Sequence, residues 1–513
     1  MLVKVFGSAV DGIEARTITI EVNISQGINF YLVGLPDSAI KESHQRIISA
    51  ITTNGYKWPG KKIVINMAPA DMRKEGSAYD LPIATGILAA SEQINSERLS
   101  DFIIMGELSL DGEVKPVKGA LPIAVNAREA GFKAIILPIE NTYEAAVVEG
   151  IDVYGVSHIR ELIEFLNNET QLSKVELNIE EEFLKSVDNY EFDFADVKGQ
   201  ENVKRALEVA AAGGHNIIMI GPPGSGKTML AKRIPGILPP LSIEEAIETT
   251  KIHSVAGKTN GEVSLLIHRP FRNPHHTISD VALVGGGTFP QPGEISLAHN
   301  GVLFLDELPE FKRTVLEVLR QPLEDRIVTI SRAKFSVEYP ASFMLVASMN
   351  PCPCGFYNHP TKQCMCTSAN VQKYLNRISG PLLDRIDIHL EVTPVEFNEL
   401  STIRQGERSS EIRKRVIAAR QIQLERFKNK KNVYCNAQMN SSMIKEFCVL
   451  DQTGLMLLKN AMEKLDLSAR AYDRIIKVAR TIADLDSCED IKPQHLAEAI
   501  HYRSLDRESW GSY

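Results

Sequence analysis

The sequence predicts an α/β protein in three parts, and three observations support this fold class. Residues 1–170 read as strands and short helices separated by Gly and Pro. A glycine-rich loop at 221–228 follows an apolar strand and precedes a helical segment, as expected of a parallel α/β core. After about residue 392 the apolar spacing becomes helical to the end. A chain of 513 residues also exceeds the ~250–300 at which a single core stops growing, so several domains are expected.

The composition is that of an ordinary globular protein, with 44% hydrophobic and 24% charged residues. The longest apolar runs, such as Phe102–Met105, are far shorter than the ~18 residues that span a bilayer, and the first residues lack the apolar core of a secretory signal. We therefore expect a cytoplasmic protein without membrane contact. The net charge of −8 argues against a passive nucleic-acid coat protein, yet it leaves room for a local basic channel.

Changes in composition place the domain boundaries. The first α/β domain takes residues 1–170, and an acidic segment with eight carboxylates and two lysines, 171–196, is predicted to be a linker. A solvated helix within this segment is an equally open interpretation. The α/β core is expected over 197–392 and a helical domain over 393–513. In the core, a first helix with one apolar face should end at Gly213 and Gly214.

The glycine-rich loop predicts a site for the phosphates of a nucleotide. It reads G-x-x-x-x-G-K-T, and its residues are Gly221, Pro222, Pro223, Gly224, Ser225, Gly226, Lys227 and Thr228. Such a loop turns its backbone N–H groups toward phosphate oxygens, and the following helix adds its positive N-terminal dipole. Lys227 is expected to reach the β and γ phosphates, and the Thr228 hydroxyl to bind Mg²⁺.

A second nucleotide motif follows about eighty residues later. The apolar strand Val302–Leu305 ends in two adjacent carboxylates, Asp306 and Glu307. Asp306 would hold the hydrated Mg²⁺, and Glu307 would orient the water that attacks the γ phosphate. A buried strand that ends in two acids is usually structural when it stands alone, but together with the glycine-rich loop it predicts ATP hydrolysis.

These two motifs occur in order with further distinctive stretches, including RPFRNPHHTISD, MNPCPCG, ISGPLLDRIDIHLEV and SARAYDRIIKVARTIADL. Over essentially its whole length the chain resembles the ComM/YifB family of magnesium chelatase-like AAA+ ATPases. The resemblance implies a P-loop AAA+ core followed by a helical lid, with ATP and Mg²⁺ bound. It also implies a ring, most commonly a homo-hexamer, that moves on single-stranded or branched DNA, with recombination proteins as possible partners.

The resemblance adds three roles for which local patterns give no evidence. Asn350 would be the sensor that helps to place the lytic water. Arg385 would be the arginine finger that one subunit offers to the nucleotide of its neighbour. Arg470 would be the lid sensor, with Arg474 as a second candidate. Independently, the apolar stripe after Ser468 predicts a helix that this serine caps.

Four of the seven cysteines cluster directly after Asn350 with the spacing C-x-C-x₉-C-x-C, namely Cys352, Cys354, Cys364 and Cys366. Four thiolates can close a tetrahedral zinc site that holds a loop without a core of its own. We therefore predict structural Zn²⁺. Free thiols in a mobile loop, or redox chemistry, are the alternatives, and His359 is a less favoured substitute ligand.

The first domain resembles the Lon protease domain in MAPADMRKEGSAYDLPIA and GELSLDGEVKPVKGALPIAVNAREAG. Lon-type proteolysis needs a serine activated by a lysine. The resemblance places Ala78 at the serine position and Leu121 at the lysine position, while Ser77 and Lys118 are offset. We therefore expect a Lon-like domain without the catalytic dyad, which serves as a scaffold or as a DNA-contacting annex.

Three functions compete for the motor. The first is a DNA translocase or helicase that promotes branch migration in recombination or natural transformation. The second is a chelatase-type motor that drives a partner complex, and the third is an ATP-dependent protease or remodelling factor. A predicted hairpin with Arg332 and Lys334 at its tip favours the first, because basic side chains in a ring pore hold DNA phosphates without reading sequence. The basic stretch 401–432 is interpreted either as a second phosphate-binding face or as a helix with one solvated side.

Overall fold

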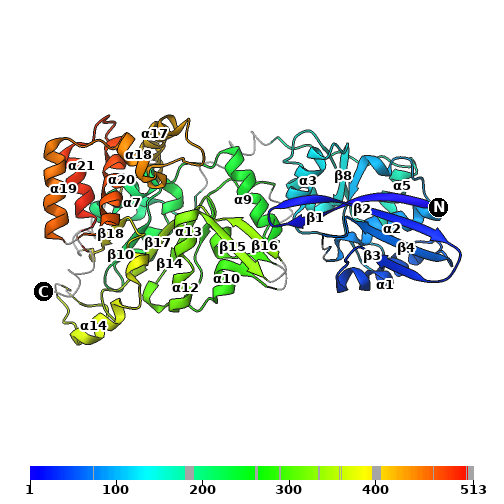
Figure 1. Ribbon diagram of the computed structural model, residues 1–513, viewed down its shortest axis with the longest axis horizontal. Coiled ribbons are helices and arrows are strands. Elements are labelled where there is room, and N and C mark those ends of the chain that lie inside the picture. Colours follow the sequence, from blue (N-terminus) through cyan, green and yellow to red (C-terminus); the bar gives the residue numbers. More distant parts are fainter. Residues whose placement is uncertain are drawn as a thin grey trace.

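The structure is a computed structural model of the chain. It describes every residue except 73, 75, 179–189, 260–263, 288–289, 333–334, 358, 360, 396–405, 466, 504 and 506–513. The central part of the predicted linker and the predicted hairpin-tip residue Lys334 therefore lie outside the described residues. Figure 1 shows an elongated arrangement with the N-terminal domain at one end, the helical domain at the other and the α/β core between them. In the described part of the chain, no helix has the length and apolar character needed to cross a membrane.

The N-terminal domain is built on a seven-stranded mixed sheet of order β3-β4-β2-β1-β5-β8-β9. Strands β1 and β2 form a long antiparallel pair in which Leu2 lies opposite Asn23. Strand β5 pairs with β1 in parallel, and β8 and β9 extend the sheet in the same direction. The strands are β1 (Leu2–Asp11), β2 (Glu14–Ser25), β3 (Phe30–Val33), β4 (Lys62–Ala68), β5 (Phe102–Ile104), β8 (Ala134–Pro138) and β9 (Asp152–Val156), with a small hairpin of β6 (Glu107–Leu108) and β7 (Val114–Lys115). The helices are α1 (Ser38–Thr53), α2 (Asp80–Ala90), α3 (Ala120–Glu129), α4 (Thr142–Ala145) and α5 (Ile159–Leu166).

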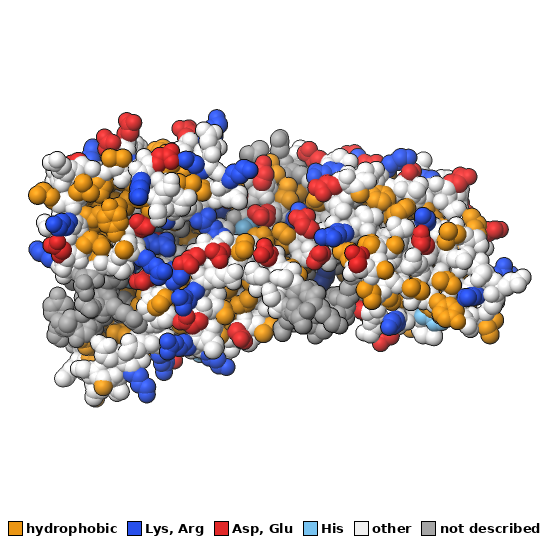
Figure 2. Space-filling view, in the orientation of Figure 1, with side chains coloured by type: hydrophobic (Ala, Val, Ile, Leu, Met, Phe, Trp, Pro, Cys, Tyr) orange, Lys and Arg blue, Asp and Glu red, His pale blue; other side chains and the backbone are white. Residues whose placement is uncertain are grey.

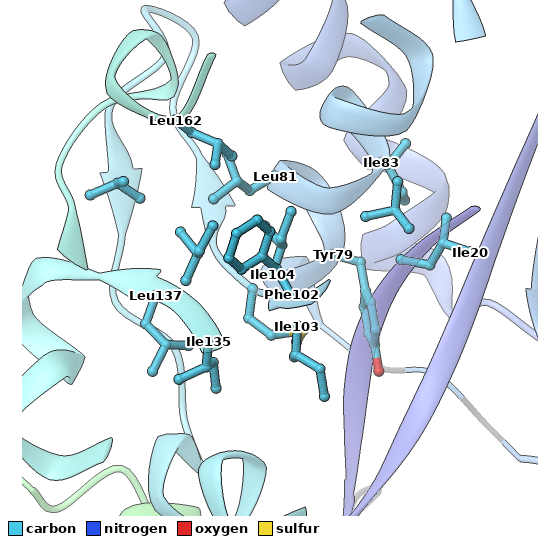
Figure 3. Close-up of a cluster of buried hydrophobic side chains, with 14 of the residues drawn as sticks. Ile20, Tyr79, Leu81, Ile83, Phe102, Ile103, Ile104, Ile135, Leu137 and Leu162 are labelled. Carbon is cyan, nitrogen blue, oxygen red and sulfur yellow. The ribbon is translucent and has the colours of Figure 1, made fainter. Parts of the chain in front are cut away.

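Buried aliphatic side chains form the core of this domain. Helix α2 is buried along its whole length, and Ile103 of β5 lies in the same cluster, as Figure 3 shows. Tyr79 is also buried there, and its hydroxyl donates to the carbonyl oxygen of Ser8. Burial of this extent stabilises the domain by about 25 cal/mol for each Å² of apolar surface removed from water.

The central domain contains a parallel five-stranded sheet of order β11-β14-β17-β10-β18. Its strands are β10 (Ile217–Ile220), β11 (Phe271–Arg272), β14 (Val302–Leu305), β17 (Met344–Met349) and β18 (Ile388–Glu391). In β10, β14 and β17, alternate residues enter different apolar clusters, one shared with the helical domain and one with the cysteine region. Covering both faces explains why these strands read as continuous apolar runs.

Short helices and hairpins surround this sheet. The helices are α7 (Glu201–Gly213), α8 (Lys227–Ala231), α9 (Ile243–Val255), α10 (Asp280–Val284), α11 (Glu294–Leu297), α12 (Arg313–Glu317), α13 (Arg320–Asp325), α14 (Ser368–Leu375) and α15 (Gly380–Leu383). Two antiparallel hairpins pair β12 (Gly285–Gly286) with β13 (Gln291–Pro292), and β15 (Ile327–Arg332) with β16 (Phe335–Pro340). As predicted, α7 ends at the two glycines, with Gly214 in the left-handed region at φ 68°.

The C-terminal domain is helical, as the sequence predicts. It contains α17 (Ser409–Phe427), α18 (Ser441–Phe447), α19 (Gln452–Lys464), α20 (Ala469–Leu485) and α21 (Pro493–His501). Helix α20 begins at the predicted cap, because the Ser468 side chain accepts from the N–H of Ala471. Seven 3₁₀ turns also lie along the described chain, at Ser77–Tyr79, Leu99–Asp101, Ile139–Asn141, Phe194–Asp196, Ile234–Ile237, Leu308–Glu310 and Asn436–Gln438.

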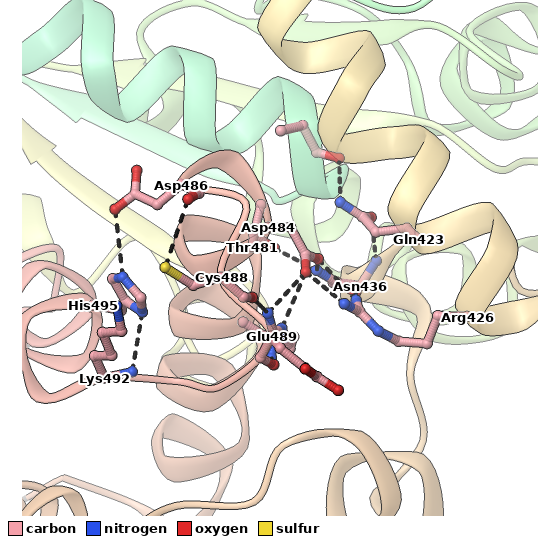
Figure 4. A network of polar contacts seen from close by, with 12 residues as sticks. Gln423, Arg426, Asn436, Thr481, Asp484, Asp486, Cys488, Glu489, Lys492 and His495 are labelled. Carbon is pink, nitrogen blue, oxygen red and sulfur yellow. Dashed lines mark hydrogen bonds and ion pairs between the residues drawn. The ribbon is translucent and has the colours of Figure 1, made fainter.

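A buried polar network ties the helices of this domain together and to the core (Figure 4). Arg426 of α17 pairs with Asp484 of α20 at 2.5 Å and donates to the Asn436 side-chain oxygen at 2.9 Å. Thr481, also on α20, contacts the ring of His215 at 2.8 Å, just before β10. Because buried charges and amides are stable only when they are partnered, this network fixes how α20 sits on the core.

The N-terminal domain docks onto the core through helix α9. Leu241, Ala246 and Leu265 of the core belong to the apolar cluster of the N-terminal domain. Glu144 is buried at the junction, where it accepts from the Thr259 hydroxyl at 3.0 Å. Figure 1 shows α9 beside α3, between the two sheets. The two domains are therefore joined by a packed interface as well as by the connecting chain.

Candidate nucleotide site

The glycine-rich loop joins the carboxyl end of β10 to the first turn of α8. Gly224 and Gly226 have φ angles of 79° and 90°, a region that residues with a Cβ rarely adopt. A Cβ on Gly221 would lie 2.2 Å from the carbonyl oxygen of Val392, so this position also requires glycine. The sequence therefore folds into the tight loop that a phosphate-binding cradle needs.

Lys227 lies inside this loop. Its Nζ donates to the carbonyl oxygens of Gly221 at 2.7 Å and Pro222 at 2.9 Å, and it lies 3.3 Å from the Asn350 side-chain oxygen. Burial lowers the pKa of Lys227, and the carboxylates of Asp306 and Glu307 oppose that shift. The ammonium group is thus held next to both acidic residues that the sequence assigns to nucleotide chemistry.

Thr228 and Asp306 meet across the gap between α8 and the end of β14. The Thr228 hydroxyl donates to Asp306 Oδ2 at 2.8 Å. The other carboxylate oxygen accepts from the Ser348 hydroxyl on β17 and from the Glu307 N–H, the latter at 3.1 Å. A hydroxyl and a carboxylate so close together are the oxygen ligands that Mg²⁺ prefers.

Glu307 leaves the strand in the left-handed region, with φ 54° and ψ 51°. A residue with a side chain rarely takes this conformation, and such strain concentrates at functional sites. Its N–H also lies 3.4 Å from the Ser348 hydroxyl. The turn separates the side chain of Glu307 from that of Asp306, which suits two carboxylates with different tasks.

All these side chains lie at one edge of the sheet. Strands β10, β14 and β17 are parallel neighbours, so the residues that follow them converge at their carboxyl ends. Lys227, Thr228, Asp306, Glu307 and Asn350 come together there. We call this group the nucleotide cluster.

Two members of this neighbourhood were not predicted from the sequence. Ser348 supplies the hydroxyl to Asp306, and the only signal was a polar residue within the apolar strand Met344–Met349. Gln200 donates to the carbonyl oxygens of Ser225 at 3.0 Å and Thr393 at 2.8 Å. No spacing pattern marks Gln200, because its contacts join segments that are far apart in the chain.

Arg385 lies at the opposite edge of the same sheet. It precedes β18, and Asn216, which precedes β10, donates from its side chain to the Arg385 carbonyl at 3.2 Å. The guanidinium is 6% exposed and pairs with Glu324 of α13 at 2.5 Å. A four-residue strand separates the two edges by ~13 Å, so Arg385 does not reach the nucleotide cluster of its own chain.

Arg470 and Arg474 lie on the same side as Arg385. Arg470 is 59% exposed and lies 3.9 Å from Asp384, while Arg474 pairs with the fully buried Asp387 at 2.9 Å. Neither arginine is part of the nucleotide cluster of this chain. On the face shown in Figure 2, Lys and Arg side chains gather near the junction of the helical domain and the core.

Asp387 anchors this edge, and the sequence did not reveal it. It accepts from the Asn216 N–H at 2.9 Å and lies 3.5 Å from the His215 ring. Burial alone would raise the pKa of Asp387, but Arg474 and His215 outweigh it, and the pKa falls well below its usual range. Burial lowers the pKa of His215, so its ring is neutral at pH 7.

The four clustered cysteines come together in space. Their Sγ atoms all lie within 4.8 Å of one another, and the Cys352–Cys354, Cys352–Cys364 and Cys354–Cys364 separations are 3.3, 3.7 and 3.5 Å. Tetrahedral thiolates ~2.3 Å from a zinc ion would be about 3.8 Å apart, so the group fits Zn²⁺. His359 is not part of the group, and its Nδ1 accepts from the N–H groups of Thr361 and Lys362 instead.

The two residues that the Lon resemblance places at the dyad positions, Ala78 and Leu121, are both apolar. Leu121 is fully buried in the apolar core, and Ala78 packs against the same cluster. Ser77 donates to Glu107, whereas the Lys118 side chain lies against Gly257 of the core. The offset serine and lysine therefore have different neighbours, and the absence of a catalytic dyad stays a prediction.

The two basic regions differ from each other. Strands β15 and β16 form the predicted hairpin, with Arg332 paired to Phe335, but the side chain of Arg332 lies outside the described residues, as does Lys334. In the basic stretch, Arg415 binds Glu208 and Glu407 at 2.5 Å, and Arg420 donates to carbonyl oxygens of α7. These two arginines hold α17 on the core. They therefore belong neither to a phosphate-binding face nor to a solvated side of the helix, the two interpretations that the sequence suggested.

Comparison with known proteins places the chain among relatives over nearly its full length. Family models described as magnesium chelatase subunit ChlI match residues 193–400, 20–141 and, for the C-terminal part, 406–503. YifB of Escherichia coli (strain K12) is 46% identical over 504 residues, which cover 97% of this chain and 96% of that protein. The competence protein ComM of Haemophilus influenzae is 44% identical over 512 residues, or 99% and 98% of the two chains. Lon protease 2 of Bacillus subtilis is 28% identical over 148 residues, which cover 28% of this chain and 26% of the protease.

Proposed function

Because this chain belongs to the Mg-chelatase ChlI-type ATPase family, with YifB and ComM as homologues, we propose that it is a ring-forming DNA translocase that ATP hydrolysis drives. Its task would be branch migration in recombination or natural transformation. The observation that carries the proposal is the separation of the nucleotide cluster from Arg385 at the two edges of one sheet. A chain with half of a catalytic site at each edge needs a neighbour to complete it.

Each residue of the nucleotide cluster has a task in this proposal. Backbone N–H groups of residues 221–226 and the Lys227 ammonium bind the phosphates of ATP. Thr228 and Asp306, whose oxygens are 2.8 Å apart, hold Mg²⁺, which neutralises charge on the phosphates. Glu307 orients the attacking water, and Asn350, 3.3 Å from Lys227, assists in placing it.

The arginines of the opposite edge would act on the nucleotide of the adjacent subunit. Arg385 is the proposed arginine finger, and its bond to Glu324 must be exchanged for the γ phosphate when subunits assemble. Arg470, with Arg474 as the second candidate, is the proposed lid sensor. Head-to-tail contacts of this kind close into a ring, and we propose a homo-hexamer.

DNA is the proposed substrate of the motor. Support comes from the relative named as a competence protein and from the β15–β16 hairpin, in which Arg332 pairs with Phe335 and the sequence places Lys334 between them. Basic groups in a ring pore hold phosphates of either strand without sequence preference, and such binding weakens with salt. The cysteine group, with its four sulfur atoms within 4.8 Å, is the proposed site of a structural Zn²⁺.

The test is the ATPase rate of the purified chain with and without single-stranded and branched DNA, beside Lys227→Ala. We expect DNA to stimulate the wild-type rate and the Lys227→Ala rate to stay at background. An ATPase that DNA leaves unchanged would contradict the DNA substrate. For the metal, Cys352→Ser should lose two thirds or more of the bound zinc in metal analysis, and a zinc-free wild-type protein would exclude that site.

The alternative function is a chelatase-type ATPase that drives a partner complex. The match of all three family models to magnesium chelatase subunit ChlI favours it. In the same assay this alternative predicts stimulation by another protein and none by DNA.

A further inference from the structure

The cysteine loop, residues 351–367, connects β17, whose end carries a residue of the nucleotide cluster, to α14. It starts directly after Asn350, whose side-chain oxygen lies 3.3 Å from Lys227 Nζ. It ends at Thr367, which caps the start of α14, and Tyr374 near the end of that helix belongs to the same apolar cluster as Cys352. One end of the loop is thus fixed beside Asn350, and the other end is fixed to a helix that packs in the same cluster.

The middle of the loop touches the glycine-rich loop itself. Gly355 has φ 83°, and a Cβ built on it would lie 2.4 Å from Pro223 Cδ and 2.7 Å from Pro223 Cγ. The backbone at Gly355 is therefore packed against the phosphate-binding loop with no room for a side chain. No intervening group separates the cysteine loop from the wall of the nucleotide site.

Among the described residues of the loop, Tyr357 and the four cysteines pack in or against the core cluster. Cys352 and Gly355 are buried, but Pro353, Thr361, Lys362, Gln363 and Met365 are exposed, Met365 at 92%. Two local bonds shape the turn, from the Gly355 N–H to the Cys352 carbonyl at 2.9 Å and from the Tyr357 N–H to Cys352 Sγ at 3.3 Å. Both converge on a cysteine of the four-sulfur group.

We propose that the metal-held cysteine loop is a structural wall of the nucleotide site, so that nucleotide binding and hydrolysis depend on the metal. A thiolate-preferring divalent ion, Zn²⁺, fixes Cys352 and with it Gly355, Pro223 and Asn350. The inference rests on the proposed ATPase function and adds a positioning role for residues that do not contact the nucleotide.

Gly355→Ala tests the contact without touching a metal ligand. Its matched control is Gly131→Ala, because Gly131 has a similar φ of 80° and nothing within 4 Å of a built Cβ. Both variants should retain the zinc content of the wild type. In a fluorescence titration with N-methylanthraniloyl-ADP and Mg²⁺, Gly355→Ala should bind about tenfold more weakly and Gly131→Ala within twofold of wild type, because overpacking displaces Pro223.

Removal of the metal tests the other half of the proposal. The double variant Cys364→Ser/Cys366→Ser should lose its zinc and bind the same probe about tenfold more weakly, whereas Cys488→Ser in the helical domain should keep both properties. The proposal is overturned if the zinc-free double variant binds the probe like wild type, or if Gly355→Ala matches Gly131→Ala. A wild-type protein that binds no nucleotide would instead refute the ATPase function itself, which separates the two failures.

Discussion

The two edges of the five-stranded sheet hold charged groups in different ways. At the carboxyl edge, Lys227 Nζ lies 3.3 Å from the Asn350 side-chain oxygen, and the Thr228 hydroxyl donates to Asp306 at 2.8 Å. At the amino edge, Arg385 and Arg474 are held by Glu324 and Asp387 of their own chain. Under the function that we propose, the first edge binds the nucleotide, and the second keeps its cations in place for the nucleotide of a neighbouring subunit.

The largest effect that would sharpen this comparison is expected for Arg385→Ala. In assembled protein its ATPase rate should fall by about a thousandfold, because an arginine finger compensates charge that develops in the transition state. Binding of N-methylanthraniloyl-ADP should change less than twofold, since the chain's own nucleotide cluster is intact. Lys414→Ala, which removes an exposed lysine 2.9 Å from Glu411, is the control with wild-type rates.

Mixing two inactive variants would decide whether the edges belong to one site or to two chains. An equal mixture of Lys227→Ala and Arg385→Ala subunits should recover roughly a quarter of the wild-type ATPase rate, because half of the glycine-rich loops and half of the arginines are intact and combine at random. The measurement is the ATPase rate after the variants are mixed and reassembled. No recovery at any mixing ratio would mean that Arg385 serves its own chain.

A smaller effect, on stability, is expected from Asp387→Asn. Without this carboxylate Arg474 loses the partner of a buried ion pair, which costs about 3 kcal/mol and lowers the Tm. The matched control is Asp384→Asn, because Asp384 lies 3.9 Å from the exposed Arg470 and its loss should cost well under ~1 kcal/mol. Equal Tm values for the two variants would contradict the anchoring role of Asp387.

The smallest effect concerns pH. Burial lowers the pKa of His215 and of His389, so both rings take up a proton less readily in the folded chain than in the unfolded chain, where the pKa is about 6.5. Stability is therefore lost as the pH falls below 6.5, by up to ~1.4 kcal/mol per pH unit for each ring. Tm values at pH 7.5, 6.5 and 5.5 should show this decline, and His215→Gln should make it shallower.

The low pKa of Asp387 affects the stability over a lower pH range than the two histidines do, so the two effects can be distinguished. Its ionised form stabilises the folded chain at every pH above its unfolded value near 4, and this contribution is lost only as the pH falls further. A decline between pH 6.5 and 5.5 that persists unchanged in His215→Gln would exclude His215 as its source.

How much of the site could be predicted depended on where its residues lie in the chain. Residues 221–228 and Asp306 with Glu307 form contiguous motifs next to apolar strands, so their chemistry could be inferred from spacing alone. Ser348 and Gln200 could not, because each acts only through contacts with other segments of the chain. The fold class was predicted for the same reason as the motifs, since helical and strand periodicities are local.

The sequence by itself determined the glycine-rich loop, the acidic strand end, the four-cysteine spacing and the three kinds of structure along the chain. Only the tertiary structure decided that Arg385, Arg474 and Asp387 share one edge while the nucleotide cluster occupies the other. The reason is that the order of the parallel strands sets which strand ends lie side by side. The contact of Gly355 with Pro223 was likewise decided only by the tertiary structure. It joins two loops about 130 residues apart in the chain, which lie close together because β17 pairs with β10. A local sequence pattern contains no information about this pairing.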